Sequence, residues 1–179
     1  MNIFALDKDY NTCAKMHNDK HVVKMITEYG QLLSTAHRVL DGYKEIDYSS
    51  GRKATRFVFG DDRDDKFYKS THVKHPSNIW ARESKENYMW LYNLFVALSK
   101  EFTFRYGKVH KTYTKLKDVL KTPPVNISNT GLTPVAQAMP DIYKQDDFVQ
   151  AYRKFYLGDK KEFSKWTKRK VPRWYLTNN

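Results

Sequence analysis

The sequence has few of the features that mark exported or membrane proteins. Cys13 is its single cysteine, so no disulfide can form within the chain, and a lone thiol fits a reducing compartment such as the cytoplasm. The sequence contains no apolar run of about 18 residues. Its N-terminus also lacks the charged-then-apolar pattern of a signal peptide. We therefore expect a cytoplasmic protein with no membrane partner.

Several motifs of cofactor and metal chemistry are missing as well. The sequence has no P-loop, no dinucleotide-binding glycine fingerprint and no nucleophile elbow, and we expect no cofactor. His17 and His21 have the spacing at which two histidines can share an ion. No HExxH arrangement and no second cysteine accompany them. We expect no metal, and a metal-dependent nuclease is a minor alternative.

Positive charge is abundant: 32 Lys and Arg residues face 20 Asp and Glu, for a formal net charge of +12. Such an excess attracts polyanions and supplies the sequence-independent part of nucleic-acid affinity. A solvated Lys-rich surface without such a partner explains the composition equally well. Duplex DNA is the partner we expect, with a monomer favoured.

Length and periodicity predict the fold class. A chain of 179 residues fits one domain, and apolar residues recur at helical spacing over about 12–40 and about 77–105. The charged, glycine-broken stretch 41–74 is expected to be irregular, and we find no alternation typical of strands. Residues 122–146 are rich in loop signals. We predict an all-α, compact, single-domain helical fold over residues 1–179 with long ordered loops.

Weaker helical patterns occur toward the C-terminus. One lies near residues 111–121 and another over 147–156, where apolar residues recur at helical spacing. A short basic helix is expected at about 160–168, and a basic aromatic tail completes the segment 147–179.

A polar stripe borders the apolar face of the first predicted helix. Its members follow one another at helical steps and are His17, His21, Lys24, Glu28 and Thr35. A carboxylate there has a pKa that partial burial and nearby cations can set, as a general acid or base requires. An amine nucleophile is available too, since α-amines such as that of Met1 titrate near pH 8. A solvated polar helix face is the alternative.

Two further segments are candidates for binding nucleic acid. Asn78, Arg82, Ser84 and Asn87 surround the start of the second long helix, where free amides can hold a phosphate. Between residues 165 and 175, five cations alternate with three aromatic residues, a combination that grips phosphates and stacks on bases. Helix capping and an inward-packed tail are the structural alternatives. The expected nucleic-acid contacts are Lys24, Arg82, Asn87, Arg105, Lys168, Arg169, Arg173, Trp174 and Tyr175.

The order of these features resembles the phage pyrimidine-dimer DNA glycosylases, the endonuclease V family of compact all-α proteins. Ile3 resembles the family's N-terminal isoleucine, and Asp19-Lys20-His21 followed by Glu28 resembles its Asp-x-His triplet and catalytic glutamate. The Trp80 to Gly107 helix and the Pro172 to Tyr175 segment look like its aromatic middle helix and C-terminal loop. Segments starting at His21 and Gln137 are similar to phage proteins. A phage origin would place the protein in the host-cell cytoplasm.

The resemblance implies a DNA-repair enzyme, a DNA glycosylase with AP-lyase activity that acts on damaged or modified bases through a Schiff base. Met1 would supply the nucleophilic amine, Glu28 would stabilise the charged intermediate and move protons, and His21 would orient the DNA or Glu28. Thr27 and Gln31 stand where the family has arginines, which bears on recognition of a pyrimidine dimer. A DNA base-modifying transferase on the same fold, and a non-catalytic nucleic-acid-binding or anti-defence phage protein, are the alternatives.

Overall fold

A computed structural model describes residues 1–49 and 51–177. Residue 50, which we expected in a loop, and residues 178–179 of the predicted tail lie outside the described residues. The chain is mostly helical, with 51% of residues in helices, which confirms the predicted helical character. The elements in chain order are α1 (Tyr10–Met16), α2 (Asp19–Asp41), β1 (Tyr43–Asp47), β2 (Ala54–Val58), α3 (Arg63–Lys66), α4 (Pro76–Glu83), α5 (Lys85–Tyr106), α6 (Lys111–Leu116), η1 (Asp141–Tyr143), α7 (Phe148–Leu157), η2 (Lys161–Phe163) and α8 (Arg173–Leu176).

Both long predicted helices are broken by a capping residue. The stretch expected at 12–40 forms α1 and α2, separated where Asn18 turns extended and accepts a hydrogen bond from the His21 amide. The stretch expected at 77–105 forms α4 and α5, because Ser84 is extended and accepts from the Asn87 amide. Asn and Ser satisfy the free amides of a helix start, so they favour a new helix over continuation. Gly107 caps α5 in the left-handed conformation, as expected.

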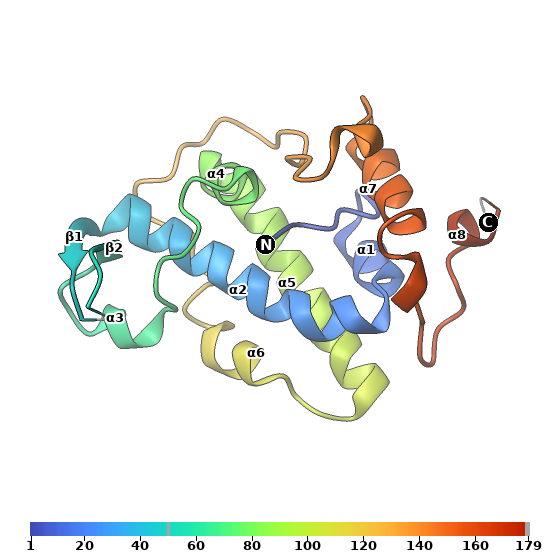
Figure 1. Ribbon diagram of the computed structural model, residues 1–179. Coiled ribbons are helices and arrows are strands. Elements are labelled where there is room, and N and C mark those ends of the chain that lie inside the picture. Colours follow the sequence, from blue (N-terminus) through green and yellow to red (C-terminus); the bar gives the residue numbers. More distant parts are fainter. Residues whose placement is uncertain (50, 178–179) are drawn as a thin grey trace.

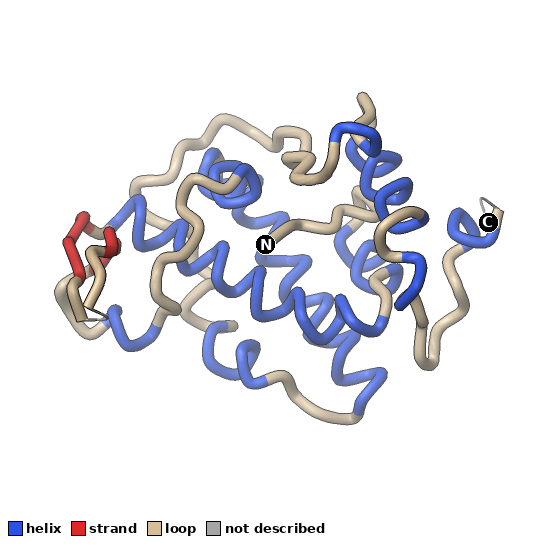
Figure 2. Tube along the Cα trace, in the orientation of Figure 1, coloured by secondary structure: helices blue, strands red, loops and turns tan. Residues whose placement is uncertain are grey.

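The irregular segment predicted at 41–74 is wrong in part, because it contains an antiparallel hairpin. Strand β1 pairs with β2 in a register that sets Tyr43 opposite Val58 and Asp47 opposite Ala54. Most residues of β1 are exposed, so no buried face imposed an apolar alternation on its sequence. The hairpin, with α3 beside it, lies at one end of the molecule (Figure 1; Figure 2).

The other differences concern short C-terminal elements. The helix predicted near 111–121 ends at Leu116, and the one predicted at 147–156 is α7. The helix predicted at 160–168 is wrong, since only Lys161–Phe163 form a 3-10 turn there.

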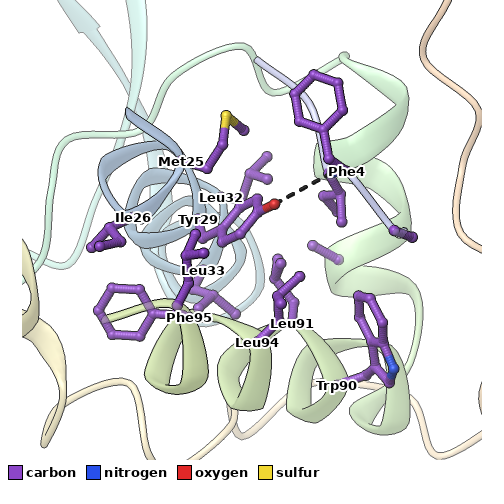
Figure 3. Close-up of a cluster of buried hydrophobic side chains, with 14 of the residues drawn as sticks. Phe4, Met25, Ile26, Tyr29, Leu32, Leu33, Trp90, Leu91, Leu94 and Phe95 are labelled. Carbon is purple, nitrogen blue, oxygen red and sulfur yellow. Dashed lines mark hydrogen bonds between the residues drawn. The ribbon is translucent and has the colours of Figure 1, made fainter. Parts of the chain in front are cut away.

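The core lies where α2 and α5 pack and where the N-terminal segment crosses them. Buried Leu32, Leu33, Leu91 and Leu94 come from these two helices, and Tyr29 lies fully buried among them (Figure 3). The Tyr29 hydroxyl accepts a hydrogen bond from the Phe4 amide at 3.3 Å, which ties residues 3–6 to the middle of α2. The N-terminus therefore lies over the centre of the molecule rather than at its edge (Figure 1).

Candidate active site at the N-terminus

Asn2 fixes the start of the chain against three distant elements. Its side-chain amide donates to the Ala138 carbonyl at 2.8 Å, and its side-chain oxygen accepts from the Ile3 amide and the Tyr152 hydroxyl. Its backbone N–H donates to Glu28 Oε2 at 3.0 Å. Asn2 is 8% exposed, so these bonds form where water competes little. These hydrogen bonds of Asn2 therefore also fix the position of Met1.

The Met1 side chain is held in the core, whereas the Met1 α-amine lies at the candidate active site. The side chain is 4% exposed and packs against the core, whereas the residue as a whole is only half-buried. The solvent contact of Met1 therefore comes from its backbone, which carries the α-amine. That nitrogen lies 3.8 Å from Glu28 Oε2, and Asn78 Nδ2 lies 3.7 Å from the Met1 sulfur.

Glu28 presents one carboxylate to two cations. Oε2 faces the Asn2 amide and the Met1 amine, while Oε1 lies 3.1 Å from Lys24 Nζ, one helical turn earlier. The Glu28 side chain is 12% exposed and that of Lys24 is 63% exposed. Lys24 can therefore leave Glu28 for a phosphate without unfolding any structure. A contact between Lys24 and nucleic acid stays a prediction.

The start of α4 forms the other side of the site. His75 caps α4 by accepting from the Ser77 amide at 3.2 Å, and Asn78 Nδ2 donates to the carbonyls of Thr71 and His72. Burial, and then the positive charge of the Met1 amine, lower the pKa of His75. Asn78 Oδ1 and Ser77 Oγ are buried without a hydrogen-bond partner among the described residues. Such atoms need an explanation, and a bound ligand or water supplies one.

His75 and Asn78 were not expected beside the Met1 amine. Asn78 was expected to hold a phosphate with its neighbours in sequence. The run His75-Pro-Ser is a helix-capping signal, which places the side chains on α4 but does not show what α4 faces.

His21 lies beside the site in a neutral form. Its Nδ1 is hydrogen-bonded to the Tyr156 hydroxyl at 2.5 Å, and its ring stacks on Phe4 with 4.1 Å between centroids. Burial, followed by the nearby His17 ring and the positive charges of three lysines, lowers its pKa to about 2. The partner of Nδ1 is thus Tyr156 and not Glu28. His21 supports the Phe4 segment, and the expectation that it orients Glu28 directly has no support from these contacts.

Two of the expected DNA contacts are interior residues, and their assignment is wrong. Asn87 is fully buried, and its side chain bonds the Trp80 carbonyl, the Thr133 hydroxyl and the Thr133 amide. The Arg105 side chain is 0% exposed and pairs with Glu101 and Asp19. Neither can reach a phosphate without breaking the core. A sequence pattern cannot separate such buried polar residues from surface ones of the same type.

Arg82 on α4 is only partly available for a contact with nucleic acid. Its Nη2 donates to the Val73 carbonyl at 2.8 Å, and burial lowers its pKa. Its Nη1 is buried without a hydrogen-bond partner among residues 1–49 and 51–177. The Val73 bond fixes the segment that precedes α4, so the main effect of Arg82 is on the shape of that segment.

The aromatic residues of the C-terminal cluster pack inward. Tyr175 is 8% exposed, with its ring 4.8 Å from that of Trp166. Trp174 Nε1 donates to the Met16 sulfur at 3.3 Å, and its ring lies 6.1 Å from that of Tyr156. The expectation that Tyr175 stacks on bases is therefore wrong, and Trp174, which is half-buried, has one part of its ring committed to the fold.

The cations of the same cluster divide into two kinds. Arg169 makes two hydrogen bonds to the Glu101 carboxylate, at 2.9 and 2.8 Å, so it mainly neutralises a buried acid. Lys168 and Arg173 are exposed, as a phosphate contact requires. Helix α8 lies at the end of the molecule away from the hairpin, whereas the N-terminus is central (Figure 1). The cluster and the Met1 site are therefore separate surfaces.

Comparisons with protein-family models, curated proteins and solved structures found no match to the chain. Within the part of the chain that the structure describes, no group of three or more His, Cys, Asp or Glu side chains is arranged to hold a metal ion. None of the helices among those residues is long and apolar enough to cross a membrane.

Proposed function

We propose that the protein is a DNA glycosylase with AP-lyase activity of the endonuclease V type, with the Met1 amine as nucleophile and Glu28 as the catalytic carboxylate. One observation carries the proposal: the α-amine of Met1, on the backbone that gives this half-buried residue its solvent contact, lies 3.8 Å from a largely buried carboxylate on α2. An amine and a carboxylate close to each other are the two groups that Schiff-base chemistry at a sugar carbon requires.

In the proposed reaction the unprotonated amine attacks C1′ of the target nucleotide, the base leaves with the electrons of the glycosidic bond, and the nitrogen, now positively charged, loses a proton. The C1′–O4′ bond then breaks, O4′ takes a proton, and the nitrogen becomes a cationic Schiff base. Removal of a C2′ proton expels the 3′ phosphate by β-elimination. Glu28 is placed to stabilise the cation and to carry these protons, because the same carboxylate faces the reacting nitrogen.

The lysine and histidine near the amine have separate roles in this proposal. Lys24 balances Glu28 in the free protein and is exposed enough to meet a phosphate when DNA is bound. His75, partly shielded from water and near the Met1 amine, tends to stay neutral there. A neutral imidazole puts no second positive charge beside the Met1 amine, and its Nδ1 stays bonded to the Ser77 amide.

The Glu28→Gln variant tests whether Glu28 is the catalytic carboxylate, and the measurement is cleavage of the DNA strand. Glutamine keeps an oxygen to accept the Asn2 N–H but loses the negative charge. Cleavage of duplex DNA with an abasic site should fall by a factor on the order of 100 or more, while affinity stays within a few-fold. Glu162→Gln, an exposed residue on η2 with the same charge change, is the matched control and should cleave normally.

Normal cleavage by Glu28→Gln would remove the carboxylate from the mechanism. Binding of DNA with no cleavage by the unaltered protein would favour the non-catalytic alternative. Transfer of a group to an intact strand would favour the base-modifying transferase on the same fold.

A further inference from the structure

An open, basic groove runs between the hairpin and the segment that precedes α4. It is lined by residues 44 and 55–57 of the hairpin and by residues 70–75, and its volume is about 740 Å³. We call it the hairpin groove. Its lining contains Lys44, Arg56, Lys74, His72 and His75, and no Asp or Glu. A groove lined by one sign of charge attracts the opposite sign.

The two lysines of the hairpin groove are available to a ligand. Lys44 and Lys74 are exposed and have no ion-pair partner among residues 1–49 and 51–177. Arg56 is more constrained, since its Nε lies 3.5 Å from Asp47 Oδ2 and its side chain is 37% exposed. The groove thus offers one uncommitted charge on each wall, Lys44 on the hairpin and Lys74 on the facing segment, and one shared charge, Arg56, on the hairpin.

One end of the groove is tied to the proposed nucleophile. The Asn78 amide donates to the Thr71 and His72 carbonyls in the groove wall and lies 3.7 Å from the Met1 sulfur. The Thr71 amide donates to Thr35 Oγ1, so the wall also rests on α2. In Figure 1 the segment after α3 crosses α2 toward α4, between the hairpin and the N-terminus.

We propose that the hairpin groove binds the phosphodiester backbone of the DNA strand that carries the target nucleotide, next to the Met1 amine. The inference rests on the proposed function for the identity of the nucleotide, but the groove and its charges stand independently of the chemistry. Phosphate oxygens suit Lys44 and Lys74, which act as point charges without fixed geometry. Thr55 adds a hydroxyl group that can donate to phosphate.

The test compares Lys44→Gln/Lys74→Gln with Lys100→Gln/Lys108→Gln, an equal charge change on exposed lysines of α5 and its C-terminal turn. The probe is duplex DNA with an abasic site, titrated from about 50 to about 200 mM salt. Each lost phosphate contact lowers the salt slope by about 0.9, so the groove variant should lose about 12-fold less affinity over this range than the unaltered protein. An equal slope for both variants would overturn the proposal.

Neutral methylphosphonates placed singly on either side of the abasic site locate the contact. At one of these positions, the substitution should weaken binding by the unaltered protein several-fold and have little further effect on the groove variant. Equal weakening of both proteins at every position would mean a general polyanion surface and would overturn the proposal. If the groove variant loses affinity as expected but the unaltered protein never cleaves, the groove stands and the lyase assignment fails.

Discussion

Acidification should destabilise the fold strongly because three buried histidines are held neutral. Burial lowers the pKa of His17 and of His37 from 6.5 to about 4, and that of His21 to about 2. His17 is hydrogen-bonded to the Cys13 carbonyl and the Tyr29 hydroxyl, so its ring has no access to water. Below pH 6.5 the unfolded chain binds protons that the folded chain does not, so stability is full above that pH and is lost as the pH falls toward 4.

The size of this loss follows from the three pKa values. Each histidine costs about 1.4 kcal/mol per pH unit once the unfolded imidazole is mostly protonated. Between about pH 7 and about pH 5 the loss is roughly 2 kcal/mol per histidine, or about 5 to 6 kcal/mol for the three. That is comparable with the whole unfolding free energy of a typical domain, roughly 5–15 kcal/mol. Carboxylates contribute little in this window because they titrate mainly below it.

Urea unfolding at several pH values measures the effect. His37→Gln should reduce the pH slope by about one third, since one of three similar contributions is removed. His72→Asn is the control, because His72 is exposed and its left-handed backbone suits asparagine, and it should leave the slope unchanged. A total loss below about 1.5 kcal/mol between pH 7 and 5 would refute the argument that these rings are neutral in the fold.

Two further predictions concern residues at which the structure differs from what the sequence led us to expect. Asn18→Ala removes the cap of α2 and should lower the unfolding free energy by about 1 kcal/mol in urea; no change would mean that α1 and α2 are not divided at this residue. Tyr175→Ala should destabilise by about 3 kcal/mol while leaving DNA affinity of the folded protein within two-fold, because its ring is buried against Trp166. A stable variant with much weaker DNA binding would restore the base-stacking role, and Arg173→Gln serves as the comparison for an exposed neighbour.

Much of the helical architecture could be predicted from periodicity, but its interruptions could not. Apolar stripes locate α2 and α5 because a helix that buries one face must repeat every 3.6 residues. Asn18 and Ser84 lie within those stripes, and only their caps reveal that the chain changes direction there. The hairpin could not be predicted because β1 is largely exposed and β2 is mostly half-buried, so neither strand has a buried face that would require apolar residues at alternate positions.

The contacts of the candidate site were still harder to predict from the sequence, because they join residues that lie far apart in the chain. Spacing places Glu28 at the border of the apolar face, but the approach of Met1 depends on Asn2 bonding Tyr152 and Ala138, which lie far away in the chain. The pairing of Met1 with Glu28 was expected only from the family resemblance. In the C-terminal cluster, alternating cations and aromatic residues did not show that Tyr175 faces inward.

The central claim, that the Met1 amine is the nucleophile, is tested most directly by borohydride trapping on duplex DNA with an abasic site, followed by mass spectrometry of the adduct. The account predicts a protein–DNA adduct on the α-nitrogen of Met1, and its loss when that nitrogen is acetylated. An adduct on a lysine such as Lys24, trapping that survives acetylation, or no adduct at all would contradict it.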